Sequence, residues 1–337
     1  MRWIVVLITV FIIVFYFSPP DEQAPFNDTS FQMEQRSHDN IVIEGLGAWI
    51  GKTEEEVKQT FGQPARIDPS AYGYVWWVYN DPKTYMQIGI RDGRVVTIYA
   101  CGPEVNVAPF QINRSINELL QTMPLHDDIH VQLDDGVYRF QLTEEDLMIQ
   151  PLLSFGDVYV QLYIDRFTGT LSSVRFLDGE TLVHIRPYEL KYRGPLPEVA
   201  IDETLEKQIE RANAEQIFDI TNVMRARHGI SPLTWDERVA QVAYEHSKDM
   251  AENKFFAHES PTSGDLQQRL IRAGISFELA GENIAAEYAD APAVVEAWLN
   301  SRSHRQTLLN NELTHLGVGV YKRYYTQNFI RPLSQPK

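Results

Sequence analysis

Three ionisable residues in the C-terminal half of the chain have the types and spacing needed for a shared site. His258 lies in FFAHESP, Glu282 opens GENIAAEY, and His304 lies in NSRSHR, and each is predicted just outside a regular element. Two imidazoles and a carboxylate form a ligand set that Zn²⁺ accepts, with a fourth position for water. The same groups could transfer protons without a metal, because imidazole titrates near neutral pH. No compact motif such as H-E-x-x-H joins them, so three separate, backbone-bonded groups are the alternative.

Other polar residues in this half are expected to have structural roles. His246 lies on the apolar face of a predicted helix and His315 opens a predicted strand, so each is expected to be a hydrogen-bonded structural histidine. Asn283 is expected to tie loop backbone beside the site through its amide. Ser260 and Ser303 lack the G-x-S-x-G turn that exposes a nucleophilic serine. The chemistry therefore depends on the two histidines and Glu282.

A change of hydrophobic period near residue 203 marks the region that must position these groups. Apolar residues recur with a helical period from about Glu206, and Gly229 ends this first helix. A second helix is predicted to open with a capping box at Thr234 and Glu237, a third to span 263–274, and a fourth 290–301. Short strands are predicted at 281–288, 315–321 and 324–330. Helices around a small antiparallel sheet predict an α-β-α layered domain.

Residues 45–185 contain an internal repeat. IGKTEEEVKQTFG begins at Ile50 and INRSINELLQTMP at Ile112, an offset of 62 residues. Both copies carry the S/T-x-x-E capping pattern, which predicts helices over 53–61 and 115–123. Strands at 72–80 and 85–100 are matched to 137–142 and 158–177, with hairpin turns at 92–93 and 168–169. We predict an α+β module made of two helix-plus-meander units. The aromatic residues of 72–80 are assigned to packing, with ligand contact as the alternative.

The remaining segments predict export and flexible connections. After Arg2 an uncharged apolar run extends from Trp3 to Phe17, the length of a signal-peptide core and short of the roughly 20 residues of a full span. The following Ser-Pro-Pro is a poor cleavage site, so residues 1–17 are expected to be an uncleaved signal anchor, with a cleaved signal peptide as the alternative. Residues 18–44 are predicted to form a flexible stalk. Residues 186–202 are predicted to be a linker without regular elements.

Charge and cysteine content exclude some classes of partner. Asp and Glu number 46 against 30 Lys and Arg, a net charge of −16, which repels phosphate backbones, so nucleic acid is not an expected partner. The single cysteine, Cys101, cannot form an internal disulfide and is expected to be a buried thiol. One cysteine in an exported chain fits bacterial export.

Motifs across residues 208–332 resemble the SCP-like extracellular domain of the CAP superfamily, which comprises cysteine-rich secretory, antigen 5 and pathogenesis-related proteins. The resemblance rests on N-x-x-R-x-x-x-G at Asn222, LTW, AHESPTSG, AGENIA, AWLNSRSHRQTLLN and HLGVGVY, in that order. Residues 45–185 are similar to the CAP-associated N-terminal module of Gram-positive proteins, through IGKTEEEV and the repeat. The chain is thus expected to be a bacterial CAP protein with domains at 45–185 and 203–333.

The resemblance implies an α-β-α sandwich with a cleft lined by two His and two Glu, where some members hold a divalent metal. His258, Glu282 and His304 match three of these four positions, with Asn283 beside them. The fourth, three residues after the helix tryptophan, is Ser301 here, so a two-carboxylate zinc site is incomplete. Glu296 lies about 160° around the helix from that tryptophan and is not expected to replace the missing Glu.

Three functions are weighed on these residues. We expect an extracytoplasmic protein, anchored by its N-terminal segment or secreted, whose cleft binds a small ligand, an envelope partner or a divalent metal without catalysis. The alternative is a metal-assisted hydrolase of peptide or cell-wall polymer, with Zn²⁺ or Glu282 activating water and His258 and His304 as partners. Sterol or lipid binding follows from the resemblance alone, and no long apolar loop supports it.

Overall fold

The computed structural model describes residues 43–117, 123 and 125–333. The predicted signal anchor, all but the last two residues of the predicted stalk, and most of the helix predicted over 115–123 therefore lie outside the described residues. Within the part of the chain that is described, no helix has both the length and the apolar character needed to cross a bilayer.

The N-terminal region is built on a seven-stranded antiparallel sheet in the order β1-β2-β3-β4-β9-β8-β7. Both predicted hairpins are present, β3 to β4 and β8 to β9, and their inner strands β4 and β9 pair at the centre of the sheet. The sheet strands are β1 (Arg66–Pro69), β2 (Val75–Tyr79), β3 (Met86–Arg91), β4 (Arg94–Ala100), β7 (Leu152–Phe155), β8 (Val158–Asp165) and β9 (Thr170–Asp178).

The internal repeat is visible as a repeated contact between a helix start and a hairpin turn. In the first copy, η1 (Gly45–Trp49) precedes α1 (Glu54–Phe61), and Thr53 and Glu56 form the predicted capping box. The backbone N–H of Glu54 donates to the Gly93 carbonyl at 2.9 Å, and 62 residues later Ile116 donates to the Gly169 carbonyl at 3.2 Å. The two meanders are thus equivalent units placed side by side.

The strand predicted at 137–142 is present but does not occupy the place of residues 72–80. It is β6 (Gly136–Gln141), which pairs with β5 (Asp128–Leu133) and β10 (Glu189–Arg193) in a separate three-stranded sheet. The edge position matching β2 is taken by β7, which pairs with β8 as β2 pairs with β3. The second copy carries additional elements, α3 (Glu144–Ile149) and α4 (Gly179–Ile185), whose apolar side chains, together with the small sheet, form their own hydrophobic cluster. The strand matching proposed from sequence was therefore wrong at this point.

The predicted linker also contains regular structure. Residues 189–193 form β10 along β6, because the six consecutive residues between Pro187 and Gly194 all have a backbone N–H group that can donate to a neighbouring strand. Prolines and glycines end this strand without preventing it.

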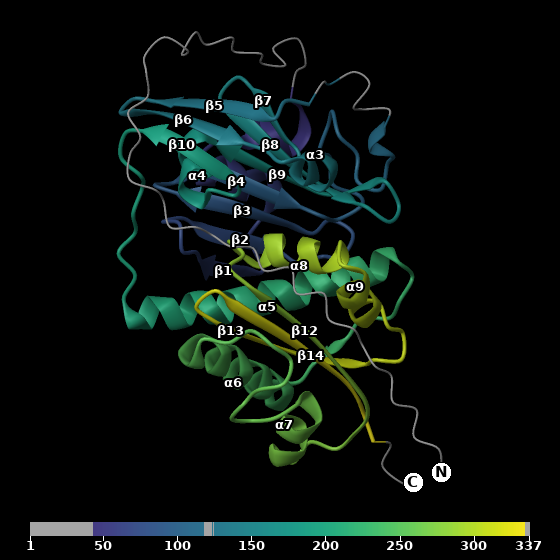
Figure 1. The fold of residues 1–337 in the computed structure, drawn as a ribbon. Helices are drawn as coiled ribbons and strands as arrows, with labels where there is room; N and C mark the ends of the chain where they lie inside the picture. Colours follow the sequence, from purple (N-terminus) through teal and green to yellow (C-terminus); the bar gives the residue numbers. More distant parts are fainter. Residues whose placement is uncertain (1–42, 118–122, 124, 334–337) are drawn as a thin grey trace. The chain divides into compact units, whose positions relative to one another are not determined.

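The C-terminal region is an α-β-α sandwich, as predicted. Its four-stranded sheet has the order β11-β13-β14-β12, with α6 packed on β13 and β14 and α5 packed on β13 from the other face. Figure 1 shows α5 and α8 between this sheet and the N-terminal sheet, with α6 on the far side. The elements are α5 (Glu203–Arg227), β11 (Thr234–Trp235), α6 (Glu237–Asn253), α7 (Leu266–Arg272), β12 (Phe277–Ala286), α8 (Ala291–Leu299), α9 (Arg302–Leu308), β13 (His315–Tyr321) and β14 (Tyr324–Pro332).

Two helix starts differ from the sequence prediction. Thr234 does not cap α6, because it pairs in parallel with β13 as part of β11. Asp236 is the N-cap instead, and its carboxylate accepts from the N–H groups of Arg238 and Val239. The third helix is shorter than predicted, since Asp265 is the N-cap of α7. For α6, Asp is a better N-cap than Thr, and α7 begins two residues later than predicted.

The two regions share one hydrophobic core. Trp76 and Val78 of β2 belong to the same buried cluster as α5, α8 and the C-terminal sheet, whereas Trp77 packs into the cluster on the opposite face, with α1. This alternation confirms that the aromatic residues of 72–80 mainly pack. Cys101 is buried in the shared core, as predicted.

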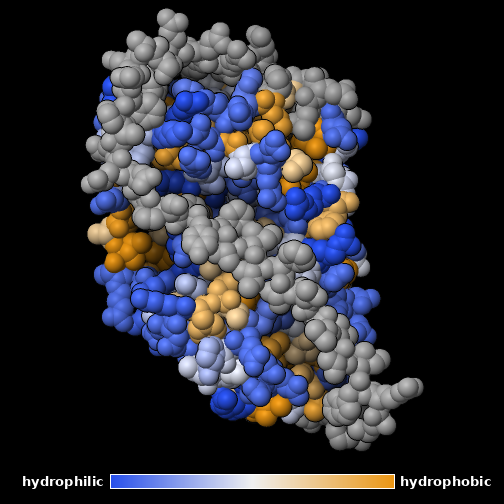
Figure 2. All heavy atoms as spheres, viewed as in Figure 1, coloured by the Kyte–Doolittle hydropathy of each residue, from blue (hydrophilic) through white to orange (hydrophobic). Residues whose placement is uncertain are grey.

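Buried ion pairs add to this contact between the regions. Arg175 of β9 and Asp290, the N-cap of α8, lie 2.7 Å apart with side chains 1% and 6% exposed. The outer surface differs from this buried contact. Figure 2 shows a mostly hydrophilic face with hydrophobic side chains gathered in patches. The visible surface is thus largely polar, while the regions meet through apolar and paired groups.

Candidate functional site

Glu282 lies in the middle of β12, the edge strand of the C-terminal sheet, where it pairs with Asn328 of β14. Sequence analysis had placed it at the start of a strand, but β12 begins earlier, at Phe277. Because side chains alternate along a strand, Glu282 and Asn283 point to opposite faces of the sheet. Glu282 faces α6 and α7, and Asn283 faces α9.

The Glu282 carboxylate is buried and fully engaged, with 4% of its side chain exposed. Its Oε1 accepts from Nδ1 of His258 at 2.9 Å, and its Oε2 accepts from the Arg269 guanidinium of α7. Asn328, with its amide oriented so that both polar atoms have partners, donates to Oε2 at 2.9 Å. Nε2 of His246 lies 3.9 Å from Oε1. A buried carboxylate is thus surrounded by donors and a cation. We call the group of His258, Glu282, Arg269 and His304 the Glu282 site.

These partners keep Glu282 ionised. Burial by itself would raise the pKa of Glu282, but the hydrogen bond from His258 and the positive charge of Arg269 outweigh it and lower that pKa below its usual value. The buried charge is tolerated because it is paired and hydrogen-bonded.

His258 lies in the loop after α6, and 42% of its side chain is exposed. Since Nδ1 faces the carboxylate, the ring donates Nδ1–H to Glu282, and Nε2 remains for solvent or a ligand. Glu282 therefore fixes both the orientation and the tautomer of this imidazole.

His304 lies within α9 rather than outside a regular element, which corrects the prediction. Burial and the charge of His258 lower the pKa of His304 to about 4, so its imidazole is neutral at pH 7. The Asn283 amide donates to the His304 carbonyl at 3.2 Å, the backbone-tying role predicted for Asn283. Ser301 is the N-cap of α9 and makes no side-chain capping bond.

The structure therefore joins His258 and Glu282 directly and brings His304 close enough to His258 for its charge to act. Glu282 belongs to β12, the edge strand of the sheet, and α9, which carries His304, contacts the same strand.

As arranged, these residues do not fit a zinc ion. Among the described residues, no group of three or more His, Cys, Asp and Glu side chains could hold a metal. Both oxygens of Glu282 already accept hydrogen bonds, and the Arg269 cation beside Oε2 repels a second positive charge. Binding a metal would require Glu282 to leave its buried ion pair.

The sequence did not identify Arg269 and Asn328 as partners of Glu282, and it did not place His246 beside Glu282. Arg269 is 5% exposed and also donates to the carbonyls of His258 and Gly264, but nothing in its local sequence marks it as the partner of a residue 13 positions away. His246 is buried and bonds the Ala257 carbonyl at 3.1 Å, the structural role predicted for it. Only the tertiary structure brings it close to Glu282.

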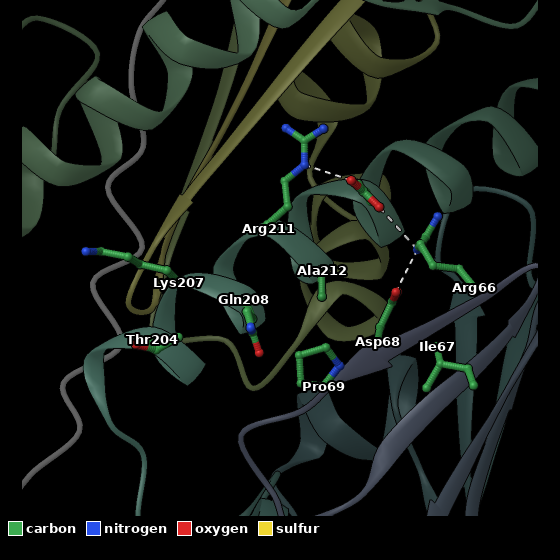
Figure 3. A pocket seen from close by; sticks show the side chains of 10 residues that line it. Arg66, Ile67, Asp68, Pro69, Thr204, Lys207, Gln208, Arg211 and Ala212 are labelled. Carbon is green, nitrogen blue, oxygen red and sulfur yellow. Dashed lines mark hydrogen bonds and ion pairs between the residues drawn. The ribbon is translucent and has the colours of Figure 1, made fainter.

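A separate groove of about 480 Å³ lies between β1 and α5, and none of the three predicted site residues lines it. Figure 3 shows Arg66, Asp68 and Arg211 joined in a chain of ion pairs, while Lys207 extends away from them. Arg66 pairs with Asp68 at 2.7 Å and with Glu215 at 3.2 Å, and Arg211 pairs with Glu215 at 2.7 Å. These four side chains are therefore paired with one another, and Lys207, which also lines the groove, pairs with Glu203 at 2.7 Å.

Comparison with known families matches both regions. Residues 50–188 match the CAP-associated N-terminal family, and residues 218–330 match the cysteine-rich secretory protein family. An uncharacterized membrane protein of Bacillus subtilis, YlbC, is 46% identical over 314 residues, which cover 92% of this chain and 90% of that protein.

Solved structures with the same fold include two bacterial proteins. An extracellular protein containing an SCP domain from Bacillus anthracis has a TM-score of 0.82 at 42% identity, covering 93% of this chain and 99% of that one. A cysteine-rich secretory protein from Staphylococcus aureus has a TM-score of 0.75 at 27% identity, covering 86% and 93%. The likeness extends through both regions of the chain.

Proposed function

The chain belongs to the CAP superfamily in its bacterial form, with a CAP-associated N-terminal domain, and from this premise we propose that it is an extracytoplasmic binding protein. Its ligand binds at His258 and His304, above the buried Glu282–Arg269 pair. The location is supported by relatives described as an extracellular protein and a membrane protein. We further propose that residues 1–17 anchor the chain to the membrane.

The observation that carries this proposal is the engagement of Glu282. Its carboxylate holds His258 and is itself held by Arg269, so it orients the site instead of offering a free oxygen to a metal or to water. What faces a ligand is the Nε2 side of His258 and the neutral ring of His304. Imidazole nitrogens make hydrogen bonds with polar groups of a ligand. The ligand class they suit is a hydroxyl- or amide-bearing segment of an envelope polymer or peptide.

The test is binding of defined peptidoglycan fragments and short peptides to the full chain by calorimetry. We expect His258→Ala and His304→Ala each to weaken binding about fivefold, because one lost hydrogen bond is worth about 1 kcal/mol. His315→Ala is the matched control, since its Nδ1 bonds Thr314 at 2.8 Å outside the site. Equal affinity in both variants and the wild type would refute this site.

A hydrolase is the second candidate, favoured by the 2.9 Å contact between the His258 imidazole and Glu282. A carboxylate that orients an imidazole is the arrangement of a general base. In this version Nε2 of His258 removes a proton from water, and Glu282 stabilises the imidazolium that forms. Hydrolysis of peptide or peptidoglycan that persists in a chelator and is lost in His258→Ala would establish it. Binding without turnover would favour the first proposal.

A further inference from the structure

The two equivalent hairpins of the N-terminal region differ in length and in what they contact. The β3–β4 turn consists of residues 92–93, and the β8–β9 turn consists of residues 166–169. Both turns receive a hydrogen bond from the helix start of their own copy, through the Gly93 and Gly169 carbonyls. The longer hairpin additionally reaches the junction between α8 and α9 in the C-terminal region.

Asn300, the C-cap of α8, makes two hydrogen bonds to the backbone of this hairpin, one through the nitrogen and one through the oxygen of its side-chain amide. Its Nδ2 donates to the Ile164 carbonyl at 2.9 Å, and its Oδ1 accepts from the Arg166 N–H at 2.9 Å. Asn300 is 8% exposed. These two bonds fix the chain immediately before α9 to the N-terminal region, because Ser301 and α9 follow directly.

A second contact holds α9 itself. Nη2 of Arg305 lies 2.8 Å from Oδ2 of Asp165, and the two side chains are 14% and 9% exposed. The other oxygen of Asp165 accepts from the Phe167 N–H at 2.9 Å, which shapes the turn. The Phe167 ring lies beneath the guanidinium of Arg305, at 5.0 Å, and that of Arg302, at 6.0 Å. The hairpin therefore contacts Arg302 and Arg305, two residues of α9 that lie on either side of His304 in the sequence.

We propose that the β8–β9 hairpin of the N-terminal domain positions α9 and so presents His304 to His258 in the Glu282 site. This inference rests on the proposed function only in taking His304 as part of that site. Asp165 and Phe167 act as positioning residues. The C-terminal side of α9 is already fixed, because Arg225 donates to the carbonyls of Leu308 and Asn310 at 2.9 Å. At the N-terminal side the hairpin adds its contacts to the hydrogen bond from the Asn283 amide to the His304 carbonyl.

The test uses the full chain with isotope-labelled histidine rings. In Asp165→Asn and Phe167→Ala we expect the ring ¹⁵N resonances of His304 at pH 7 to shift, while those of His315 do not. Amide hydrogen exchange within α9 should become about fivefold faster, since losing about 1 kcal/mol of local stability changes an opening equilibrium by that factor. Asp165→Glu should restore the wild-type resonances, because it keeps the charge that pairs with Arg305.

Matched controls come from the same hairpins. Asp92→Asn alters the shorter turn at a positive φ of 50°, which Asn tolerates, and Thr168→Ala removes an exposed hydroxyl bonded only to Thr170 at 2.8 Å; neither should move His304. Faster exchange in α9 with unchanged His304 resonances would overturn the proposal by reducing the hairpin to a structural support. Unchanged amide hydrogen exchange in α9 would also overturn the proposal, because the hairpin would then not restrain this helix. These measurements need no ligand, so they can be interpreted even if the binding experiments for the proposed function find no ligand.

Discussion

Two buried glutamates of the C-terminal domain have similar burial and opposite electrostatics. Glu282 of β12 has a side chain 4% exposed, and Glu296 of α8 is 2% exposed. Glu282 faces Arg269 and His258, and its pKa is lowered. Glu296 faces the N-terminal sheet, where its Oε1 accepts from the hydroxyls of Ser173 at 2.5 Å and Tyr99 at 3.1 Å. Burial, the largest influence there, raises the pKa of Glu296.

The difference shows that the partners, not the depth, decide what a buried carboxylate does. Hydroxyl donors do not offset the cost of desolvating a negative charge as well as a guanidinium does. Within the described residues, Oε2 of Glu296 has no hydrogen-bond partner, so this carboxyl is suited to the neutral form. Glu282 is a charged element of a site that meets solvent through His258, whereas Glu296 is part of the contact between the two domains.

Replacing Glu282 should give the largest effect in this comparison. Glu282→Ala leaves the Arg269 cation buried without its partner, and we expect a loss of about 3–5 kcal/mol in the free energy of unfolding. Chemical denaturation at pH 7 measures it. The double variant Glu282→Leu with Arg269→Met should recover part of the loss, because no unpaired charge from the pair then remains, while the carbonyls of His258 and Gly264 still lose their Arg269 donor. A single-variant loss below about 1 kcal/mol would mean that the pair is not a buried charge pair.

Removing a donor to Glu296 should cost less. Ser173→Ala deletes the 2.5 Å hydrogen bond and leaves one buried carboxyl oxygen with a single remaining donor, Tyr99. We expect a loss of about 1–3 kcal/mol, the usual cost of an unmade buried hydrogen bond. Ser303→Ala, on the exposed side of α9, is the control. A loss as large as that of Glu282→Ala would indicate that Glu296 is charged as well.

The contributions of His304 and Glu296 to folding stability should depend on pH in opposite directions. His304 has a folded pKa of about 4, below its ordinary value near 6.5. The unfolded chain therefore binds the proton first, and stability is lost as pH falls from about 6.5 toward 4, by about 1–3 kcal/mol. Glu282, whose folded pKa is lowered, adds to the loss below pH 4.5. His304→Gln should flatten the upper part of this decline in unfolding curves. A wild-type profile that stays level from pH 7 to 5 would contradict the burial of His304.

Glu296→Gln should have the smallest effect near neutral pH, within about 1 kcal/mol, because the amide carries no charge and fills the same space. Its informative feature is the pH dependence. A raised folded pKa means that the folded state holds the proton longer, so the wild type loses stability as pH rises above about 4.5 toward that pKa. The variant should lack this loss. Identical slopes for wild type and variant above pH 5 would show that Glu296 is not the group responsible.

Much of the fold could be predicted from local sequence because its signals are local. The repeat at an offset of 62 residues, both hairpin turns and the capping box at Thr53 depend on contacts between near neighbours, and all are present. The failures occurred where a distant partner decided. Thr234 pairs with β13 instead of capping a helix, β6 belongs to a separate sheet, and residues 189–193 pair with β6.

The sequence by itself determined the residue types of the site, the α-β-α arrangement of the C-terminal domain and the family to which the chain belongs. Only the tertiary structure decided that Glu282 is held by Arg269, that Glu296 turns to the other domain, and that the β8–β9 hairpin reaches α9. The physical reason is that a buried charge is fixed by whatever group lies within a few ångströms in space. Such partners are separated by 13 to 197 residues along this chain, and local periodicity carries no information over that span.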